Sequence, residues 1–458
     1  MKKLWGARFE KSTDKMADKF SFSLSYDKRL AKYDCLAGIA HTRMLVKTKI
    51  ISKKDGEAIV RGLKNILSRV EKGSLKFNPK AEDVHTVIQQ ELKSLIGEPA
   101  DKLHTARSRN DLIVTDVKLY CAEEIPSIIN YIAELQRSIV NFSVKNKATI
   151  IPAYTHMQAA QVVLLAHFML AYVEMLERDK GRLLDCSLRM DECPSGSCAL
   201  SGTSLPIDRK FTSEALGFYR ASENSIDSVS DRDFIVETLS AVAILGMHIS
   251  RMTEDIIIWS TSEFKYVEID WSLCTGSSIM PHKKNPDIAE LIRGETAKLY
   301  SNLNEVLVLL KGLPMTYNRD LQLDKPPLFE SVDKIKETLG LLAKLFETLK
   351  VNDKILENRV KDEAFFTVDV MEYLIKKGVS YRKAHDIVGK IVKDCLDKGN
   401  PIGNLSIHQL KGFAPEFELD VKNLLHAKAS VKNKRSFGST NPILVDKQLK
   451  KWSKLLNA

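Results

Sequence analysis

The most informative stretch of the chain is residues 275–287, which read TGSSIMPHKKNPD. It offers a glycine and several hydroxyl groups, followed by two adjacent lysines. Asn285 is a favourable N-cap, Pro286 suits the first position of a helix, and Asp287 suits the positive end of the helix dipole. A loop that brings hydroxyls, ammonium groups and free N–H groups to a helix start is suited to bind a carboxylate or phosphate. A surface turn with solvated lysines is the alternative, and the whole combination favours the anion site.

Outward from this loop the apolar residues recur every three or four positions, which indicates helices. Shorter helices are predicted over residues 27–50, 53–71 and 83–96. Long helices are predicted over residues 109–146 (with a kink at Pro126), 158–192, 230–262 and from Asn285 to about 310. Few segments alternate with period two, so no major sheet is expected. The sequence therefore predicts an all-α fold built on a bundle of long helices.

The helix predicted at 230–262 has a wider apolar face than one neighbour can cover, which indicates association of subunits. Two breaks interrupt the helical pattern: the small-residue stretch 193–207, expected to be a short hairpin or a connector, and the proline-containing stretch 312–327. After about residue 358 the predicted helices are shorter. We therefore expect an N-terminal helical domain at 1–107, a central long-helix bundle domain at 108–357 and a C-terminal helical domain at 358–458.

The composition is that of an ordinary protein with a large core: 458 residues, 44% hydrophobic and 28% charged. The net charge of +10 permits a nucleic-acid partner, but the lysines are dispersed and no run alternates basic and aromatic residues. No apolar run reaches the roughly 18–20 residues that span a bilayer, and the first residues lack a signal-peptide pattern. The seven scattered cysteines favour reduced thiols and form no metal-binding pattern. We expect a cytoplasmic protein without nucleic acid, membrane or metal partners.

Three further segments carry polar groups suited to chemistry. Residues 104–111, HTARSRND, combine two arginines with a helix start, where Asn110 or Asp111 is the expected N-cap. His156 is placed at the start of the helix predicted at 158–192, where an imidazole tends to be neutral and able to exchange protons. By itself such a histidine is more often structural than catalytic, although Glu290, on the first turns of the helix after the lysine loop, offers a carboxylate to orient it.

Residues 317–325, YNRDLQLDK, place a phenol, amides and cations in the second break. This range of groups suits a zwitterionic ligand, and a polar connector is an equally good interpretation.

The pattern GSSxMPxKxNP at 276–286 resembles the signature loop of the fumarase/aspartase superfamily of lyases. Within that superfamily the chain resembles the argininosuccinate lyases over essentially its whole length. The stretches that carry this second resemblance are LWGARF at 4–9, SLSYD at 23–27, TARSRND at 105–111, GTSLPIDR at 202–209 and YNRDLQ at 317–322. The loop is strong evidence for the reaction class, and the RSRND and YNRDLQ runs are good evidence for the substrate.

The resemblance implies cleavage of argininosuccinate to arginine and fumarate, with no metal or organic cofactor. It implies an all-α fold and a homotetramer in which three subunits build each active site. Carried over by motif, the catalytic residues are His156, Ser277, Lys283 and Glu290, with Lys283 neutralising charge near Ser277 and Glu290 paired with His156. The substrate-binding residues implied in the same way are Ser23, Asn110, Thr155, Asn285, Tyr317, Gln322 and Lys325.

Two positions depart from the family pattern. His282 stands where glutamine is frequent, and Ala106 stands where glycine is usual, which matters if the backbone there needs a positive φ. The competing interpretations are a sister lyase acting on adenylosuccinate, aspartate or malate, a structural protein on the same scaffold such as a lens crystallin, and a nucleic-acid-binding protein. The presence of both His156 and Ser277 favours an enzyme.

Overall fold

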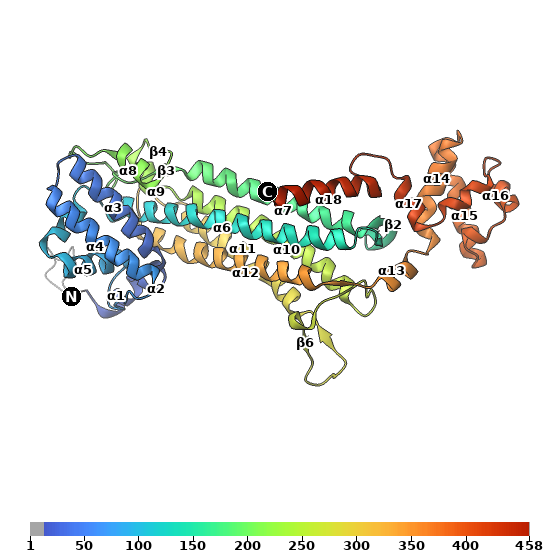
Figure 1. The fold of residues 1–458 in the computed structure, drawn as a ribbon, viewed down its shortest axis with the longest axis horizontal. Coiled ribbons are helices and arrows are strands. Elements are labelled where there is room, and N and C mark those ends of the chain that lie inside the picture. The colour runs from blue at the N-terminus through green and yellow to red at the C-terminus, as the bar shows by residue number, and fades with distance from the viewer. Residues whose placement is uncertain (1–12, 458) are drawn as a thin grey trace. The chain divides into compact units, whose positions relative to one another are not determined.

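Long helices dominate the protein, whose computed structural model describes residues 13–457 (Figure 1). The five longest are α6 (Arg109–Lys145), α7 (Leu165–Met190), α10 (Asp233–Ser260), α11 (Asp287–Leu310) and α12 (Lys325–Thr348). The predicted all-α class is confirmed, since helices predominate and the strands between residues 13 and 457 form only two-stranded sheets. The LWGARF motif at 4–9 lies outside the described residues.

The chain forms two units, and each of the five long helices contributes residues to both. The first unit comprises Met1–Ile129, Gly181–Ile244 and Ala297–Lys334, and the second comprises Asn130–Lys180, Leu245–Thr296 and Ile335–Ala458. The expected division at 107/108 and 357/358 into three domains stays a prediction.

The first unit is built from short and medium helices around the starts or ends of the long ones. Its own elements are α1 (Lys15–Ser21), α2 (Leu24–Asp27), η2 (Lys28–Leu30), α3 (Ala31–Lys47), α4 (Lys53–Glu71), α5 (Val84–Ile96), η3 (Glu98–His104), β3 (Glu192–Cys193), α8 (Arg209–Leu216), β4 (Arg220–Ala221), α9 (Ser225–Ser230) and η5 (Arg319–Asp324). Ser52 caps α4 and Asp83 caps α5, each accepting a backbone N–H of the first turn. Gly62 lets α4 approach α5 closely, because a Cβ there would come within 2.4 Å of Leu92.

The second unit holds the hairpins and the C-terminal helices. Its own elements are β1 (Ile150–Thr155), β2 (Gln158–Leu164), β5 (Val267–Glu268), η4 (Trp271–Leu273), β6 (Thr275–Gly276), β7 (Lys284–Asn285), β8 (Lys350–Val351), α13 (Asp353–Arg359), η6 (Glu363–Phe366), α14 (Thr367–Lys376), α15 (Tyr381–Lys398), η7 (Ile402–Asn404), α16 (Ile407–Phe413), η8 (Leu419–Leu424), α17 (Ala427–Asn433) and α18 (Pro442–Leu456). One of its cores is formed by α14, α15 and α16 around Leu374, Ile391 and Phe417.

The helix predicted at 158–192 is wrong over its first turns, because β1 and β2 form an antiparallel hairpin and α7 begins at Leu165. The reason is tertiary: Val162 on β2 belongs to a buried cluster that includes Phe366 and Val431. A β-branched residue packs well from a strand, and this contact outweighs the weak helical period of the segment.

Two expected N-caps are also wrong. Asn285 pairs with Thr275 in the β6–β7 hairpin, and α11 begins at Asp287. Helix α6 begins at Arg109, and the Ser108 hydroxyl accepts the N–H of Asn110 at 3.2 Å. At α6, Ser108 takes the cap role that the sequence assigned to Asn110 or Asp111, whereas α11 begins one residue after the first helical position predicted at Pro286.

Helix α10 has no unbroken apolar run of the length looked for in the sequence, but it meets the length and mean-hydropathy criteria for a membrane span. Its length and mean hydropathy of 1.4 suffice for a span, and 61% of that window is buried inside the protein. Core helices of soluble proteins meet the same criteria, so α10 by itself is weak evidence for a membrane. The stretch 193–207 is a connector rather than a hairpin, since β3 pairs in parallel with β4.

Candidate active site

The β6–β7 hairpin carries the lysine loop, with residues 277–283 at its tip (Figure 1). Strand pairing joins Thr275 to Asn285 and Gly276 to Lys284, and the Thr275 hydroxyl also bonds the Asp287 carboxylate in the first turn of α11. The base of the hairpin is therefore fixed to a long helix. The tip is exposed, and Ile279 at its end is 83% accessible.

Ser277 lies where the tip begins, and its hydroxyl oxygen accepts two backbone N–H groups. These donors are Ile279, at 3.3 Å, and Met280, at 3.1 Å. Convergent N–H groups favour negative charge on the atom that they surround. On the exposed tip these two bonds order the turn at Ser277, and they favour negative charge on its oxygen once solvent is excluded.

The two lysines of the loop have different surroundings. Lys284 pairs with Glu268 at 3.2 Å and lies 4.2 Å from the Trp271 ring centroid, so its ammonium is held at the base of the hairpin. Lys283 is exposed at the tip, where its backbone N–H bonds the Met280 carbonyl at 3.0 Å. Of the two lysines, Lys283 is the one whose side chain is exposed.

His156 lies on the two-residue turn of the β1–β2 hairpin, between Thr155 and Gln158, and its side chain is exposed. Both turn residues have positive φ, 55° for His156 and 58° for Met157, which is the pattern of a type I′ turn. Neither is glycine, asparagine or aspartate, so the backbone is strained at this point. The helix N-terminus expected at His156 is wrong, because β2 follows this turn and α7 begins only at Leu165.

Replacing Met157 with glycine is expected to raise the free energy of unfolding by about 1 kcal/mol, because glycine adopts positive φ without a Cβ clash. Met157 is 67% exposed, so little packing is lost. The matched control is Met157→Ala, which removes the same side chain but keeps the strain. Equal denaturation midpoints for the two variants would contradict strain at this turn.

Glu290 is exposed on α11, and among the described residues no hydrogen bond or ion pair joins it to His156. Asn285 contacts its own hairpin, since its amide donates to the Gly276 carbonyl at 3.5 Å. The second unit thus places Thr155 and His156 on one hairpin turn, and Ser277, Lys283 and Asn285 on the other hairpin.

The first unit gathers most of the remaining predicted residues around buried carboxylates. Ser23 is buried and donates its hydroxyl to Asp27 at 2.5 Å, and the other oxygen of Asp27 accepts the Val84 N–H at 3.1 Å. Burial raises the pKa of Asp27 to about 6. Gln322 is also buried, and its amide donates to the Ser21 carbonyl at 3.1 Å, beside Ser23.

A second buried carboxylate, Asp324, binds two cations. It pairs with the Lys325 ammonium at 2.7 Å and with the Arg232 guanidinium, and all three side chains are almost inaccessible. Burial alone would raise the pKa of Asp324, but the two cations lower it below its ordinary value. Burial raises the pKa of the half-buried Tyr317 phenol, which keeps it a neutral donor.

Asn110 and the arginines of 104–111 have separate contacts. The Asn110 amide donates to the Ala199 carbonyl at 3.0 Å, and Arg109 pairs with Asp83 at 3.0 Å. Asp111 is buried and accepts the N–H groups of Gly196 and Cys198, so it orders the 193–207 connector instead of facing a ligand. Ala106 has φ 54°, which is the positive value that glycine would adopt more readily.

Sequence reasoning missed Asp27, Arg232 and Asp324, whose buried contacts hold predicted site residues of the first unit. Each reads as an ordinary surface charge on or beside a helix, because its burial depends on contacts with residues far along the chain. The only local signal was Asp324 next to Lys325, a charge pair in a break that already held other polar groups.

The fold and the matched family models place the chain among the lyases. A family model described as Lyase matches residues 7–300, and one described as Argininosuccinate lyase C-terminal matches residues 366–432. Among solved structures, an EDDS lyase in complex with formate aligns with a TM-score of 0.84 at 25% identity, covering 97% of this chain and 90% of that one. A class II fumarase from Schistosoma mansoni, at 16% identity, aligns with a TM-score of 0.73 over 88% of this chain and 90% of that one, and supports the fold alone.

Curated relatives narrow the class. The argininosuccinate lyase of Syntrophus aciditrophicus is 47% identical over 96% of this chain and 93% of its own length. The chloroplastic argininosuccinate lyase of Arabidopsis thaliana is 45% identical over 99% of this chain and 88% of its own length. The chain therefore belongs to the argininosuccinate lyase family, whose members are carbon–nitrogen lyases.

Proposed function

We propose that this protein cleaves argininosuccinate into arginine and fumarate by β-elimination, as a step of arginine biosynthesis in the cytoplasm. The family membership supports the reaction, and the polar groups of the two units supply what it needs. The observation that carries the catalytic part is the pair of backbone N–H groups that converge on Ser277.

The reaction removes a proton from the carbon next to a carboxylate and expels a guanidino nitrogen. Negative charge then gathers on that carboxylate, so the largest catalytic contribution is electrostatic. Lys283, Asn285 and the N–H groups of the hairpin tip are the groups proposed to stabilise it. Their positions on one hairpin allow them to act together on one carboxylate.

Ser277 is the proposed base. A serine hydroxyl is a weak base in water, so its oxygen needs both donors and exclusion of solvent. The Ile279 and Met280 N–H groups provide donors at 3.3 and 3.1 Å. Closure of the exposed tip over the substrate, with Lys283 beside it, would provide the exclusion.

His156 is the proposed acid or proton relay, with Glu290 as the carboxylate that pairs with it. The leaving guanidinium is already protonated, since its pKa is above about 12, so acid assistance is needed less than for an alkoxide. The strained turn supports a functional role, because a non-glycine residue at φ 55° is retained against a local energetic cost.

Replacing His156 with asparagine is expected to lower kcat by about 10²-fold, at the lower end for loss of an acid–base group. Asparagine tolerates positive φ, so the turn is kept. The measurement is steady-state fumarate release, with Gln158→Ala as a control on the same hairpin. A loss smaller than tenfold would make His156 a structural residue.

The substrate contacts are proposed to come from both sets: Ser23, Asn110, Tyr317, Gln322 and Lys325 from the first unit, and Thr155 and Asn285 from the second. Hydroxyl, amide and phenol groups suit the carboxylates and the amino group of the substrate, and Lys325 adds positive charge. A homotetramer in which different subunits supply these residues to one site completes the proposal. Exposed apolar residues on α11, such as Leu291, Leu307 and Val308, support association.

The test of the function is absorbance near 240 nm, which rises as fumarate forms. Argininosuccinate, adenylosuccinate, aspartate and malate are tried in turn with the purified protein. Fumarate release from argininosuccinate alone is the expected result. Turnover of one of the other three but not of argininosuccinate would assign a sister lyase, and no turnover of any would favour a structural protein.

A further inference from the structure

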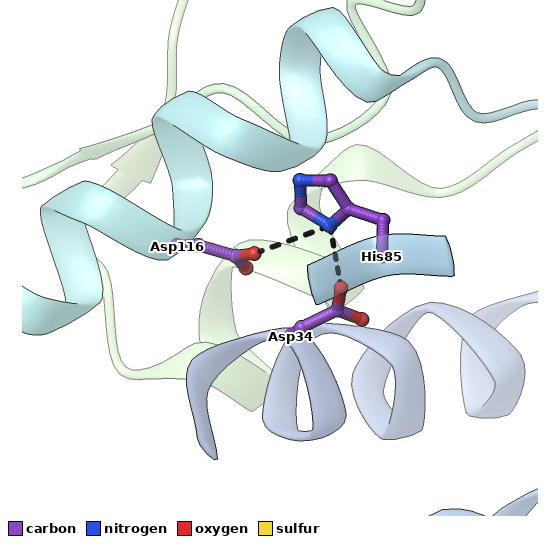
Figure 2. A group of neighbouring side chains, drawn as sticks. All are labelled: Asp34, His85 and Asp116. Atoms are coloured by element: carbon purple, nitrogen blue, oxygen red, sulfur yellow. Dashed lines mark hydrogen bonds and ion pairs between the residues drawn. The ribbon is translucent and has the colours of Figure 1, made fainter. Parts of the chain in front are cut away.

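A cluster of three buried titratable side chains lies in the first unit, apart from the proposed site residues. Asp34 comes from α3, His85 from α5 and Asp116 from α6, and Figure 2 shows all three converging between the helices. The His85 Nδ1 atom lies 2.5 Å from an oxygen of Asp34 and 3.9 Å from an oxygen of Asp116. Neither Asp116 oxygen has a hydrogen-bond partner among residues 13–457, although the side chain is fully buried.

Three acidic or imidazole ligands at this spacing invite comparison with a metal site, but their surroundings favour protons. Burial alone would lower the pKa of His85, yet Asp34 raises it above its ordinary value, and His85 in turn lowers the pKa of Asp34. Burial raises the pKa of Asp116 well above its ordinary range. The His85–Asp34 contact thus favours the charged form of both partners, and burial disfavours the charged form of Asp116 beside them.

Other charged groups near the cluster oppose a divalent cation. Arg107 acts on both carboxylates, and its buried Nε and Nη1 atoms have no hydrogen-bond partner in the part of the chain that the structure describes. The titratable and charged groups around the three residues are Asp27, Cys35, Asp83, His104, Arg107, Arg109 and Asp111. The Nε2 atom of His85 finds no hydrogen-bond partner within the described residues, whereas a metal-bound imidazole ordinarily donates its other N–H to an orienting acceptor.

The cluster is connected to Asp27 and Ser23, the latter a proposed substrate contact, through the first turn of α5. His85 is the second residue of that helix, after Val84, whose N–H donates to Asp27. Asp27 in turn accepts the hydroxyl of Ser23 at 2.5 Å. The bond from His85 to Asp34 therefore also holds the neighbouring Val84 N–H in place. Because that N–H donates to Asp27, the bond helps to fix the Asp27 carboxylate that orients Ser23.

We propose that the Asp34–His85 pair, with Asp116 beside it, is a positioning device that holds the start of α5 so that Asp27 and Ser23 present one geometry to the substrate. This rests on the proposed function, in which Ser23 binds argininosuccinate. The charge-assisted bond from His85 to Asp34 is about twice as strong as a neutral one. Loss of the imidazolium proton leaves an Nδ1–H that can still donate to Asp34 but removes the attraction between opposite charges, and so loosens the start of α5 without removing any substrate contact.

The test compares His85→Asn, which keeps an N–H donor near the Nδ1 position but no charge, with His85→Leu, which keeps neither. KM and kcat are measured from mildly acidic to alkaline pH. The wild-type KM is expected to rise as pH passes through the raised pKa of His85, since the charged form exists only below it. At every pH, His85→Asn should show the KM that the wild type has at alkaline pH. His85→Leu should have a KM at least about tenfold above that of the wild type. The kcat of both variants should stay within about threefold of the wild-type value.

A second buried pair provides the matched control. His248 and Asp179, at 2.7 Å and also buried, join α10 to α7 in the second unit. His248→Leu should lose stability as His85→Leu does, but leave KM near wild type. A KM of His85→Leu within twofold of wild type, or an alkaline rise that persists in His85→Asn, would overturn the proposal.

Hydrogen exchange of the segment around residues 82–88 gives a readout independent of turnover. Faster exchange at the start of α5 in His85→Leu, and not in His248→Leu, is expected, and unchanged protection would overturn the proposal even if the wild type releases no fumarate. Cobalt(II) titration tests the rival occupant. Stoichiometric binding with visible absorption bands that disappear in Asp116→Asn would also overturn it, because the cluster would then hold a metal instead of protons.

Discussion

Ser277→Ala is expected to lower kcat by about 10³-fold, within the range for loss of a general base. The variant removes the oxygen on which the N–H groups of Ile279 and Met280 converge. KM should change much less, because the proposed carboxylate contacts from Lys283 and Asn285 remain. Fumarate release at saturating argininosuccinate is the measurement.

The neighbouring Ser278 provides the control, since it is exposed on the same tip. Ser278→Ala should stay within about twofold of wild type, which separates chemistry at one oxygen from general disturbance of the loop. A rate for Ser277→Ala within tenfold of wild type would eliminate Ser277 as the base.

Asp324→Asn is expected to reduce the free energy of unfolding by about 3–5 kcal/mol, as is typical when one partner of a buried ion pair is removed. The variant keeps the shape of the side chain but leaves Arg232 and Lys325 as two adjacent buried cations. Because Lys325 and Gln322 flank this carboxylate, KM should rise as well. Chemical denaturation followed by circular dichroism measures the stability.

An exposed pair supplies the comparison for this variant. Arg29 and Asp333 lie 2.6 Å apart, with side chains 37% and 53% accessible. Asp333→Asn should cost no more than about 1 kcal/mol, because water screens the pair. Similar decreases in the free energy of unfolding for Asp324→Asn and Asp333→Asn would show that burial does not determine the contribution of Asp324 to stability.

The helical scaffold was predictable because its signals are local. The prediction of 53–71 coincides with α4, and that of 109–146 differs from α6 by one residue at its end. Ser52 and Asp83 cap their helices through contacts three residues away, which a sequence displays directly. Long apolar periods needed no knowledge of tertiary neighbours.

The β1–β2 hairpin was not predictable in the same way. Its strand form depends on Val162 packing beside Phe365 and Phe366, about two hundred residues later in the chain. The turn at His156 and Met157 also lacks the Asn-Gly or Asp-Gly signal of a type I′ hairpin, because positive φ is adopted by residues that disfavour it.

The candidate site was predictable in its exposed loops and less so in its interior. Ser277 and Lys283 belong to a motif whose chemistry can be recognised from the amino-acid sequence alone. Asp27 and Asp324 depend on being buried beside particular donors, and nothing in the residues around them in sequence states that burial. The assignment of roles within the motif remains a prediction that the variants above test.

Since Ser277 lies on a hairpin tip open to solvent, its oxygen is an ordinary alcohol whenever no ligand covers it. Serine hydrolases, by contrast, keep their nucleophile activated at rest by an adjacent base. Fluorophosphonate probes should therefore not react with Ser277, and activity-based profiling of a cell extract would leave the protein unlabelled. A reactive group that is assembled only on demand spares the protein from stray acylation.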